Sequence, residues 1–437
     1  GAGNAIPLRS RLATVVAASV PDADAAALRL ASDRIAPLAV RPPAPLPKEK
    51  APAPALPLDV RAGVDVLEAS GFSALQGKRV ALLTNSTGLT RDGRTTAAVL
   101  LSGKAKAAGV KLVRLFAPEH GFAASLDEKV ADGVDPATGL PVVSLYGEKR
   151  RPSPKDLEGL DAVVVDLQDA GVRFYTYLTS MGYVMEECAK AKVGVVVLDR
   201  PNPIGGGLVE GPPTDPDRLS FVAVHTIPIR TGMTIGETSR LLNEERKIEA
   251  TLTVVALRGW KRSLWYDETG LPWVNPSPNL RSVTQAALYP GVALLETTNV
   301  SVGRGTDAPF EHFGAPWIDA ERLARTLGVR NIPGVRFTPV QFTPSSSRYA
   351  GEVCRGVRVT VTDRSALRSV TLGVEIATAL RDLHPSDWKR ERFGELLGSA
   401  AAVARLERGD PSSQVVSGWA AEQMEFERRR ARFLMYD

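Results

Sequence analysis

The sequence predicts an α/β protein with a Rossmann-like, doubly wound parallel sheet, and two observations lead to this prediction. From about Gly63 to about Ala256, short and almost wholly apolar runs alternate with helical stretches. Such runs suit the strands of a parallel sheet that helices cover on both faces, and right-handed crossovers then give the doubly wound layer. After about Thr284 the alternation ends, which predicts a smaller C-terminal α+β auxiliary domain.

The individual elements follow in order along the chain. Strands are predicted at 79–84, 111–117, 161–166, 194–199 and 252–256, with helices near 95–108, 177–192 and 234–244. In the C-terminal part we expect strands near 335–342 and 357–362, and helices near 372–383 and 405–434. We therefore divide the chain into a spacer at 1–58, a Rossmann-like domain at 59–283 and an auxiliary domain at 284–437.

The first 58 residues differ from the rest in composition. They are rich in alanine and proline, with the run Pro-Pro-Ala-Pro-Leu-Pro at 42–47. Such segments favour an extended polyproline conformation, so we interpret them as a spacer with a short amphipathic helix at 25–35. The sequence begins Gly-Ala-Gly without an initiator methionine, which fits removal of a signal peptide. We therefore expect a periplasmic or secreted protein.

Composition and motifs argue against several classes of function. The 437 residues carry 54 Lys and Arg against 49 Asp and Glu, and the net charge of +5 is dispersed, without the basic stripe of a nucleic-acid-binding protein. No apolar run approaches the ~18–20 residues of a membrane-spanning helix. Cys188 and Cys354 are too few for a disulfide framework or a thiolate metal cage, and the four histidines are scattered. Nucleotide-binding, serine-hydrolase and zinc-protease motifs are missing from the sequence.

Polar residues gather where the predicted strands end. Four successive strands run into the loops at 84–88, 117–121, 166–177 and 199–203, which hold amides, carboxylates, a histidine, two arginines and two tyrosines. Each loop by itself also suits a turn or a helix cap. Ligands of open α/β sheets bind beyond the carboxyl ends of the strands, so four such loops at one edge indicate a polar pocket.

A second group of candidates lies further along the chain. Four of the six tryptophans stand at 260, 265, 273 and 317, near an Asn- and Pro-rich loop at 270–279. Tryptophan faces beside amides and carboxylates suit sugar rings, and filling an interdomain core is the alternative role. Arg304 lies between two glycines, which favours close approach to a ligand, and a bidentate arginine suits a carboxylate.

These motifs, in this order, resemble those of the exo-β-N-acetylmuramidase family of glycoside hydrolases, the NamZ type. The resemblance covers residues 63–385 and rests on the stretches LLTNSTGLTRDGR, LFAPEHGF, KVADGVDPATGLPVVSLYG, VVVDLQDAGVRFYTYLTSMGY, VVLDRPNPIGG, VEGPP, WYDETGLPWVNPSPNL, ALYPGVALLETTNVSVGRGTDAPFEHFGAPWID and RYAGEVCRGVRVTVTD. It implies two domains with the active site in the cleft between them. It also implies release of N-acetylmuramic acid from the non-reducing end of peptidoglycan fragments, in cell-wall turnover, without a metal or a cofactor.

The resemblance puts the catalytic glutamate of the family's PEHG motif at Glu119. A glutamate at a strand end in a cleft suits a general acid, because partial burial favours the protonated carboxyl. We predict Asp169 as the second catalytic group and His120 as a neighbour that bonds the substrate or shapes the loop. The other carboxylates considered for the second group are Asp166, Asp199 and Glu311. The acetamido group of the sugar is a further alternative, as the nucleophile.

Muramic acid carries a lactyl carboxylate, and we predict that an arginine binds it, with Arg304 first, Arg173 second and Arg200 third. An ion pair with a neighbouring aspartate is the alternative role for Arg200. The predicted substrate-binding residues are Asn85, Arg173, Tyr175, Tyr177, Arg200, Asn202, Trp273, Asn299, Arg304 and Glu311. Two other functions stay open from the sequence: a non-catalytic muropeptide- or sugar-binding protein on the same scaffold, and an enzyme for a nucleotide or phosphate substrate.

Overall fold

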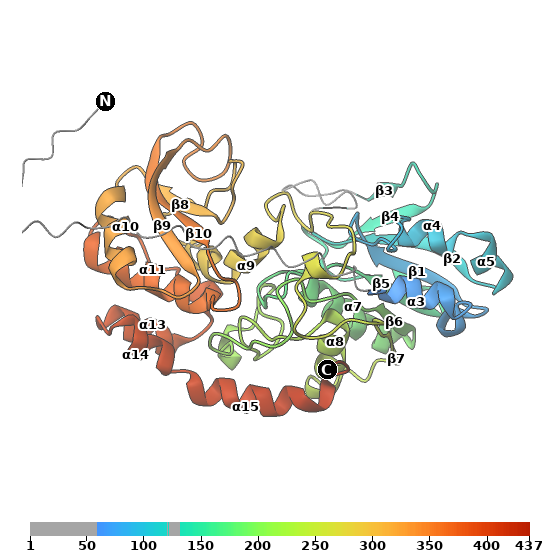
Figure 1. The fold of residues 1–437 in the computed structure, drawn as a ribbon. Coiled ribbons are helices and arrows are strands. Elements are labelled where there is room, and N and C mark those ends of the chain that lie inside the picture. Colours follow the sequence, from blue (N-terminus) through green and yellow to red (C-terminus); the bar gives the residue numbers. More distant parts are fainter. Residues whose placement is uncertain (1–58, 120, 122–131) are drawn as a thin grey trace, which may run out of the picture. The chain divides into compact units, whose positions relative to one another are not determined.

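The computed structural model describes residues 59–119, 121 and 132–437 (Figure 1). The predicted spacer at 1–58, with its helix at 25–35, lies outside the described residues, and so does His120. The described residues form a mixed α/β structure with a larger, mostly parallel sheet and a smaller antiparallel one. This confirms the predicted fold class.

The larger sheet has seven strands in the order β3-β4-β2-β1-β5-β6-β7. Their bounds are β1 Arg79–Thr84, β2 Lys111–Ala117, β3 Gly133–Val134, β4 Pro141–Ser144, β5 Ala162–Asp166, β6 Gly194–Leu198 and β7 Leu252–Val255. All neighbouring strands pair in parallel except β3, which runs antiparallel to β4 at one edge. The strand order reverses direction at β1, as in a doubly wound sheet.

Helices cover both faces of this sheet because its strands are apolar on both sides. In β1, Val80 and Leu82 face one hydrophobic core, whereas Ala81 and Leu83 face another. The first core is closed by α3 (Gly63–Ala69), α4 (Thr96–Leu100) and α5 (Gly103–Ala107), and the second by α7 (Tyr177–Ala191) and α8 (Ile235–Glu245). This double coverage is why the strands read as continuous apolar runs.

Two details of the first domain differ from the sequence prediction. The helix expected near 95–108 is divided into α4 and α5, because Ser102 begins a new helix by accepting a hydrogen bond from the Ala105 amide at 3.2 Å. Strands β3 and β4 were not predicted. They are short, and β4 is held by pairing with β2, a contact that no local pattern encodes.

The smaller sheet belongs to the C-terminal domain and is antiparallel, in the order β8-β10-β9. Its strands are β8 His312–Ala315, β9 Val335–Phe342 and β10 Cys354–Val361. Helix α10 (Ala320–Val329) packs against β9 and β10, and α11 (Ser369–Leu383) contacts both α10 and α9 (Val283–Val292). Helices α9 and α11 meet at Gly291 and Gly373, where a Cβ on Gly291 would lie 1.8 Å from the Ser369 carbonyl oxygen.

The predicted single helix at 405–434 is wrong. The structure has α13 Ala400–Glu407, α14 Ser412–Ser417 and α15 Ala420–Arg430 instead. Gly409 has a positive φ of 91°, and Pro411 lacks an amide donor and disfavours a helical residue before it, so the chain turns between α13 and α14. The remaining short elements are α6 Pro154–Leu157, α12 Gly394–Leu397, and the 3₁₀ turns η1 Ser73–Leu75, η2 Pro216–Arg218, η3 Tyr266–Glu268, η4 Ala293–Leu295 and η5 Ala431–Phe433.

The C-terminal end of the chain packs against the first domain. Arg429 of α15 pairs with Glu245 at the end of α8, with 2.6 Å between Nη2 and Oε2. The hydroxyl of Tyr436 donates to Asp199 Oδ2 at 2.5 Å and accepts from the Leu257 amide at 2.9 Å. The last residues of the chain therefore help to hold the end of β6. No helix in the described part of the chain has the length and apolar character needed to cross a membrane.

Candidate active site

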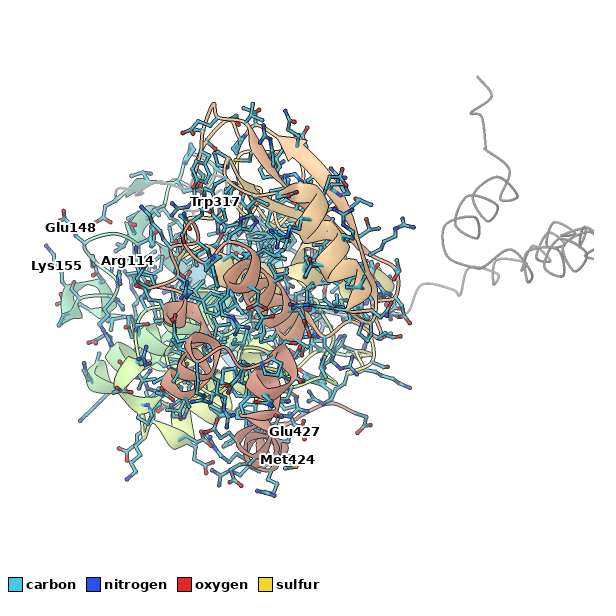
Figure 2. The ribbon with its side chains drawn as sticks, turned by 90° about the vertical axis from the view of Figure 1, so that its left-hand side faces the viewer. Arg114, Glu148, Lys155, Trp317, Met424 and Glu427 are labelled. Carbon is cyan, nitrogen blue, oxygen red and sulfur yellow. The ribbon has the colours of Figure 1, made fainter. Side chains whose placement is uncertain are left out.

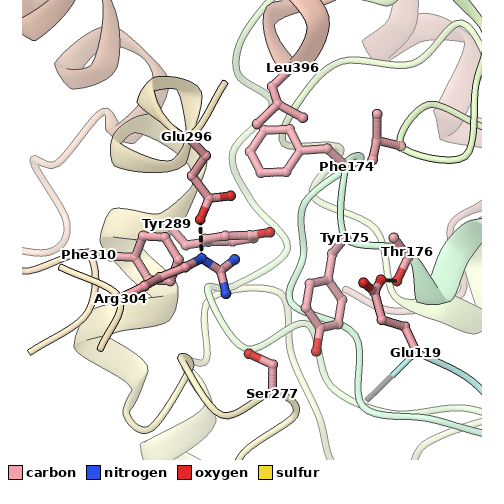
Figure 3. A pocket seen from close by; sticks show the side chains of 11 residues that line it. Glu119, Phe174, Tyr175, Thr176, Ser277, Tyr289, Glu296, Arg304, Phe310 and Leu396 are labelled. Atoms are coloured by element: carbon pink, nitrogen blue, oxygen red, sulfur yellow. Dashed lines mark hydrogen bonds and ion pairs between the residues drawn. The ribbon is translucent and has the colours of Figure 1, made fainter. Parts of the chain in front are cut away.

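A pocket of about 320 Å³ lies where the two domains meet (Figure 3). Its wall combines the loop after β2, the loop before α7, helix α9, the loop that follows α9, and α12. The lining residues are Glu119, Phe174, Tyr175, Thr176, Val222, Ser277, Tyr289, Glu296, Arg304, Phe310 and Leu396. A few charged groups among aromatic and apolar side chains are typical of a site for a small polar ligand.

Glu119 and the residues before α7 form one side of the pocket. Glu119 follows the end of β2 by two residues, and its Oε2 accepts a hydrogen bond from the Thr176 hydroxyl. Tyr175 lines the same side and donates its hydroxyl to the Pro276 carbonyl oxygen at 2.7 Å. Its ring meets that of Tyr177 edge to face, with 4.7 Å between the centroids. These contacts hold the carboxyl group of Glu119 beside an aromatic wall.

Arg304 and Glu296 form the opposite side of the pocket, as Figure 3 shows. Arg304 Nε donates to Glu296 Oε1 at 2.5 Å, and the guanidinium carbon lies 5.4 Å from the centre of the Phe310 ring. The Tyr289 ring packs against Phe310 at 4.8 Å. Burial raises the pKa of Tyr289 well above its usual value, and the negative charge of Glu296 adds to this effect. Tyr289 therefore stays neutral at physiological pH.

Two glycines turn the backbone so that Arg304 faces the pocket. Gly303 and Gly305 have positive φ angles of 82° and 78°. A Cβ on Gly305 would lie 2.5 Å from the Ser346 carbonyl oxygen, so the position has no room for a side chain. The carbonyl oxygen of Gly305 accepts from the Ser345 amide at 2.8 Å, which fastens this turn to the loop between β9 and β10.

Of the residues predicted from the sequence, Glu119, Tyr175 and Arg304 line this pocket together. Asn85 and Tyr177 lie one layer behind it. Asn85 Nδ2 donates to the Tyr177 hydroxyl at 2.6 Å, and that hydroxyl donates to Pro276 at 2.7 Å. Both side chains are buried behind the lining residues and support the aromatic wall. Their direct contact with a substrate stays a prediction.

Arg173 does not reach the pocket. Its guanidinium is buried and donates to four main-chain carbonyls: Pro212 at 2.9 Å, Ile227 at 3.0 Å, Leu396 at 2.6 Å and Leu397 at 3.1 Å. Burial lowers the pKa of Arg173 to about 9. The carbonyls come from both domains, and Leu396 itself lines the pocket. Arg173 therefore ties α12 to the first domain, in place of the predicted contact with a carboxylate.

Arg200 and the aspartates at the ends of β5 and β6 are also used internally. Arg200 Nε pairs with Asp166 at 2.5 Å, and the Thr96 hydroxyl donates to the same carboxylate. Asp199 accepts from the Thr234 hydroxyl at 2.7 Å and from Tyr436, and burial raises its pKa to about 6. None of these charged side chains is among the lining residues of the pocket. The ion-pair alternative for Arg200 is thus what the structure shows.

Asp169, predicted as the second catalytic group, is buried outside the pocket lining. Its Oδ2 accepts from the Gly171 amide at 2.6 Å, whereas Oδ1 has no hydrogen-bond partner among the described residues. Burial raises the pKa of Asp169 to about 7, although backbone amides oppose the shift. Asp169 thus shapes the turn before Arg173 and does not line the pocket. Burial raises the pKa of the Tyr177 hydroxyl, and the charge of Asp169, like that of Glu119, adds to this effect. The role of Asp169 as the second catalytic group stays a prediction.

The other predicted binding residues also lie away from this pocket. Asn202 donates to the Met233 carbonyl at 2.9 Å, and Asn299 donates to Asp387 at 2.8 Å. Trp273 packs edge to face on Tyr266, 5.1 Å between centroids. Glu311 accepts from Gln285 Nε2 at 3.0 Å and lines a separate groove beside β10. Local hydrogen bonds thus account for most of the polar residues that the sequence analysis selected.

Other lining residues escaped prediction. Glu296 and Thr176 stand in polar stretches that the sequence analysis noted, so a weak signal existed for both. Tyr289 stands in the stretch ALYPGVALLETTN on which the family resemblance rests. Leu396 lies in a short helix beyond those stretches, and the sequence carries no signal for it. In the part of the chain that the structure describes, no group of three His, Cys, Asp or Glu side chains is arranged to hold a metal ion.

Comparisons with known proteins agree with this architecture. Models of the N-terminal and C-terminal parts of the exo-β-N-acetylmuramidase NamZ match residues 80–284 and 287–436. The peptidoglycan β-N-acetylmuramidase NamZ of Bacillus subtilis (strain 168) is 38% identical over 382 residues, which span 86% of this chain and 91% of that protein.

Two crystal structures of DUF1343 family proteins from Bacteroides fragilis NCTC 9343 share the fold. One has a TM-score of 0.80 at 34% identity and the other a TM-score of 0.70 at 30% identity. Each covers 87% of this chain, and the matches span 100% and 99% of the Bacteroides chains. Since both family models and a relative match most of the sequence, the chain belongs to the exo-β-N-acetylmuramidase NamZ family.

Proposed function

We propose that the protein is a peptidoglycan-degrading glycoside hydrolase that releases N-acetylmuramic acid from the non-reducing end of glycan fragments. The observation that carries the proposal is the position of Glu119 in one pocket with Arg304, in a chain of this family. The relative from Bacillus subtilis is named for cleavage of β-N-acetylmuramides in peptidoglycan. Because this substrate is part of the cell wall, we also propose that the protein acts outside the cytoplasm.

Glu119 is the proposed general acid. Its carboxyl group transfers a proton to the glycosidic oxygen while the bond from that oxygen to C1 of the sugar breaks, and the bonding electron pair stays on the leaving oxygen. Over the whole reaction C1 forms a new bond to the oxygen of a water molecule, and a proton from that water restores the acid. The Thr176 hydroxyl, bonded to Oε2, restricts rotation of the carboxyl group. A fixed orientation favours this transfer, since the acid has to meet the glycosidic oxygen at hydrogen-bond distance.

Arg304 is the proposed contact for the lactyl carboxylate of muramic acid. Glu296 binds its Nε at 2.5 Å and so fixes the plane of the guanidinium, whose other edge faces the pocket in Figure 3. A planar guanidinium held in this way recognises a carboxylate by charge and by geometry. In this proposal Glu296 is a positioning residue for Arg304. N-acetylglucosamine lacks the lactyl group and gains nothing from this contact.

The test compares nitrophenyl β-N-acetylmuramide with the matching β-N-acetylglucosaminide, and a muramic-acid-terminated disaccharide with both. We expect the parent protein to act on the muramides and Glu119→Gln to lose about 10²–10⁴-fold in kcat/KM on the disaccharide. The loss on the nitrophenyl substrate should be smaller, because nitrophenolate leaves without a proton.

Glu158→Gln is the matched control, since Glu158 is exposed in a separate groove and its substitution should leave both rates within about twofold of the parent. A folded parent protein that cleaves no muramide would refute the proposed activity. An active Glu119→Gln variant with unchanged rates would keep the activity and remove Glu119 from the role of acid.

A further inference from the structure

An aromatic cluster outside the pocket has no role in the chemistry above. The Phe221 ring lies 6.4 Å from Tyr146 and 6.1 Å from Tyr183, and all three side chains are only partly buried. Leu219, two residues before Phe221, is 45% exposed. We call these four residues the aromatic ledge. Exposed apolar groups gathered at one place on a folded chain often mark a binding surface.

The ledge adjoins the pocket on the side of Glu119. Tyr146 lies just beyond β4, the neighbour of β2 in the sheet, and the Leu145 amide donates to the Ala117 carbonyl at 2.8 Å. Tyr146 and Glu119 therefore leave the same sheet edge from adjacent strands. A second connection runs through Val222, which lines the pocket and directly follows Phe221. Arg304 stands on the opposite side of the pocket (Figure 3).

Two arginines give the ledge a polar border. The guanidinium of Arg151 lies 3.7 Å from the centre of the Tyr183 ring and is held by ion pairs with Glu186 at 2.5 Å and Glu187 at 3.1 Å. Arg150 is exposed and lies 4.3 Å from the centre of Phe221. Glu148, close by in sequence, points outward at the edge of the molecule in Figure 2. The ledge thus combines apolar rings with charged donors and acceptors.

We propose that the aromatic ledge binds the first sugar on the leaving-group side of the cleaved bond. The inference rests on the proposed function. Glu119 has to stand at the glycosidic oxygen, so muramic acid that extends from Glu119 toward Arg304 leaves its partner sugar on the far side of Glu119, where the ledge lies. The C–H face of a pyranose packs on aromatic rings, and Arg150 is placed to donate to a hydroxyl group.

The test measures binding to the Glu119→Gln protein, in which turnover does not consume the ligand. N-acetylmuramic acid alone and the disaccharide of N-acetylmuramic acid with N-acetylglucosamine are titrated by calorimetry. Adding Phe221→Ala should raise the Kd of the disaccharide about tenfold, while the Kd of the monosaccharide changes less than about twofold, since only the disaccharide reaches the ledge. Arg150→Ala should also raise the Kd of the disaccharide, by a smaller factor than Phe221→Ala.

Phe221→Leu keeps most of the apolar volume and replaces the alanine variant if that one fails to fold. Trp265→Ala is the matched control, because Trp265 also carries an arginine over its ring, Arg364 at 5.0 Å, but lies outside the pocket lining. If Phe221→Ala weakens the binding of both ligands equally, or of neither, the ledge proposal alone is overturned. Failure of the Glu119→Gln protein to bind either ligand would instead contradict the proposed function.

Discussion

Arg173 and Arg304 lie close to the same pocket, one behind its wall and one in its lining, and the sequence predicts that both bind a carboxylate. Arg173 follows β5 and is buried, with four main-chain carbonyls from two domains around its guanidinium. Arg304 follows α9 and lines the pocket, with Glu296 at its Nε and an aromatic ring beneath it. Carbonyl oxygens surround the first arginine, whereas one edge of the second faces a cavity (Figure 3).

The difference shows how to separate supporting from ligand-binding arginines in this fold. In Arg173 both terminal nitrogens donate to buried main-chain carbonyls, and Nε has no partner among the described residues, so the enclosed guanidinium leaves no place for a ligand. In Arg304, Glu296 at Nε instead orients the guanidinium, and the side chain lines the pocket that a ligand would enter. We therefore expect loss of Arg173 to act on stability and loss of Arg304 to act on substrate choice.

The largest effect is expected for Arg173→Leu. It leaves the Pro212, Leu396 and Leu397 carbonyls without this donor, at a cost of about 1–3 kcal/mol for each group that water does not reach. The Ile227 carbonyl keeps the Thr214 amide at 3.3 Å. We predict that the free energy of unfolding falls by about 3 kcal/mol or more, measured by urea denaturation. Preference for muramide over glucosaminide in the remaining folded protein should stay as in the parent. A stable variant with altered preference would reverse the assignment of the two arginines.

The second-largest effect is expected for Arg304→Ala, in the rate of muramide cleavage. Its ion pair with Glu296 is partly exposed, so we expect a change of at most about 1 kcal/mol in stability. The value of kcat/KM on a muramide should fall about 100-fold, because the lactyl carboxylate loses its cationic partner in the pocket. Activity on the glucosaminide should change far less.

Arg304→Lys separates charge from geometry. Lysine keeps the charge but lacks the planar fork, so it should restore only part of the muramide rate. Equal losses on muramide and glucosaminide in Arg304→Ala would rule out recognition of the lactyl group by this side chain.

Much of the fold is predictable from the sequence because the patterns that define most strands, apolar runs bounded by turn residues, are local. Strands β1, β2 and β9 were predicted to the residue, since apolar or alternating runs end at clear turn residues. Strand β4 was missed because its four residues depend on pairing with β2. The helix breakers Gly409 and Pro411 are visible in the sequence, and in the structure they outweigh the helical pattern on either side and separate α13 from α14.

The candidate site was predictable only in part, for a different reason. Asn85, Asp166 and Asp199 stand at strand ends as Glu119 does, so sequence position does not distinguish them. Their partners come from distant parts of the chain: Tyr177 for Asn85, and Tyr436, 237 residues away, for Asp199. Which polar side chains remain for a ligand depends on these long-range contacts.

The smallest expected change is in the pH dependence of stability, and it concerns the buried carboxyl group of Asp169. Burial raises its pKa to about 7, above the value of an exposed aspartate, so the folded state binds a proton more tightly than the unfolded state. The contribution of this group to stability is therefore largest at low pH and is lost as pH rises from about 4 to about 7. Between pH 5.5 and pH 7 the loss is about 2 kcal/mol.

Asp169→Asn removes this titration and keeps an acceptor for the Gly171 amide. The difference in unfolding free energy between the variant and the parent should thus change by about 2 kcal/mol in favour of the variant between pH 5.5 and pH 8. Asp199, whose burial raises its pKa to about 6, titrates in both proteins and cancels in this comparison. If Asp169 is a supporting residue, muramidase activity survives the substitution. An inactive but stable variant would return Asp169 to the catalytic groups. The contrast between supporting and ligand-binding residues would then hold for the two arginines alone.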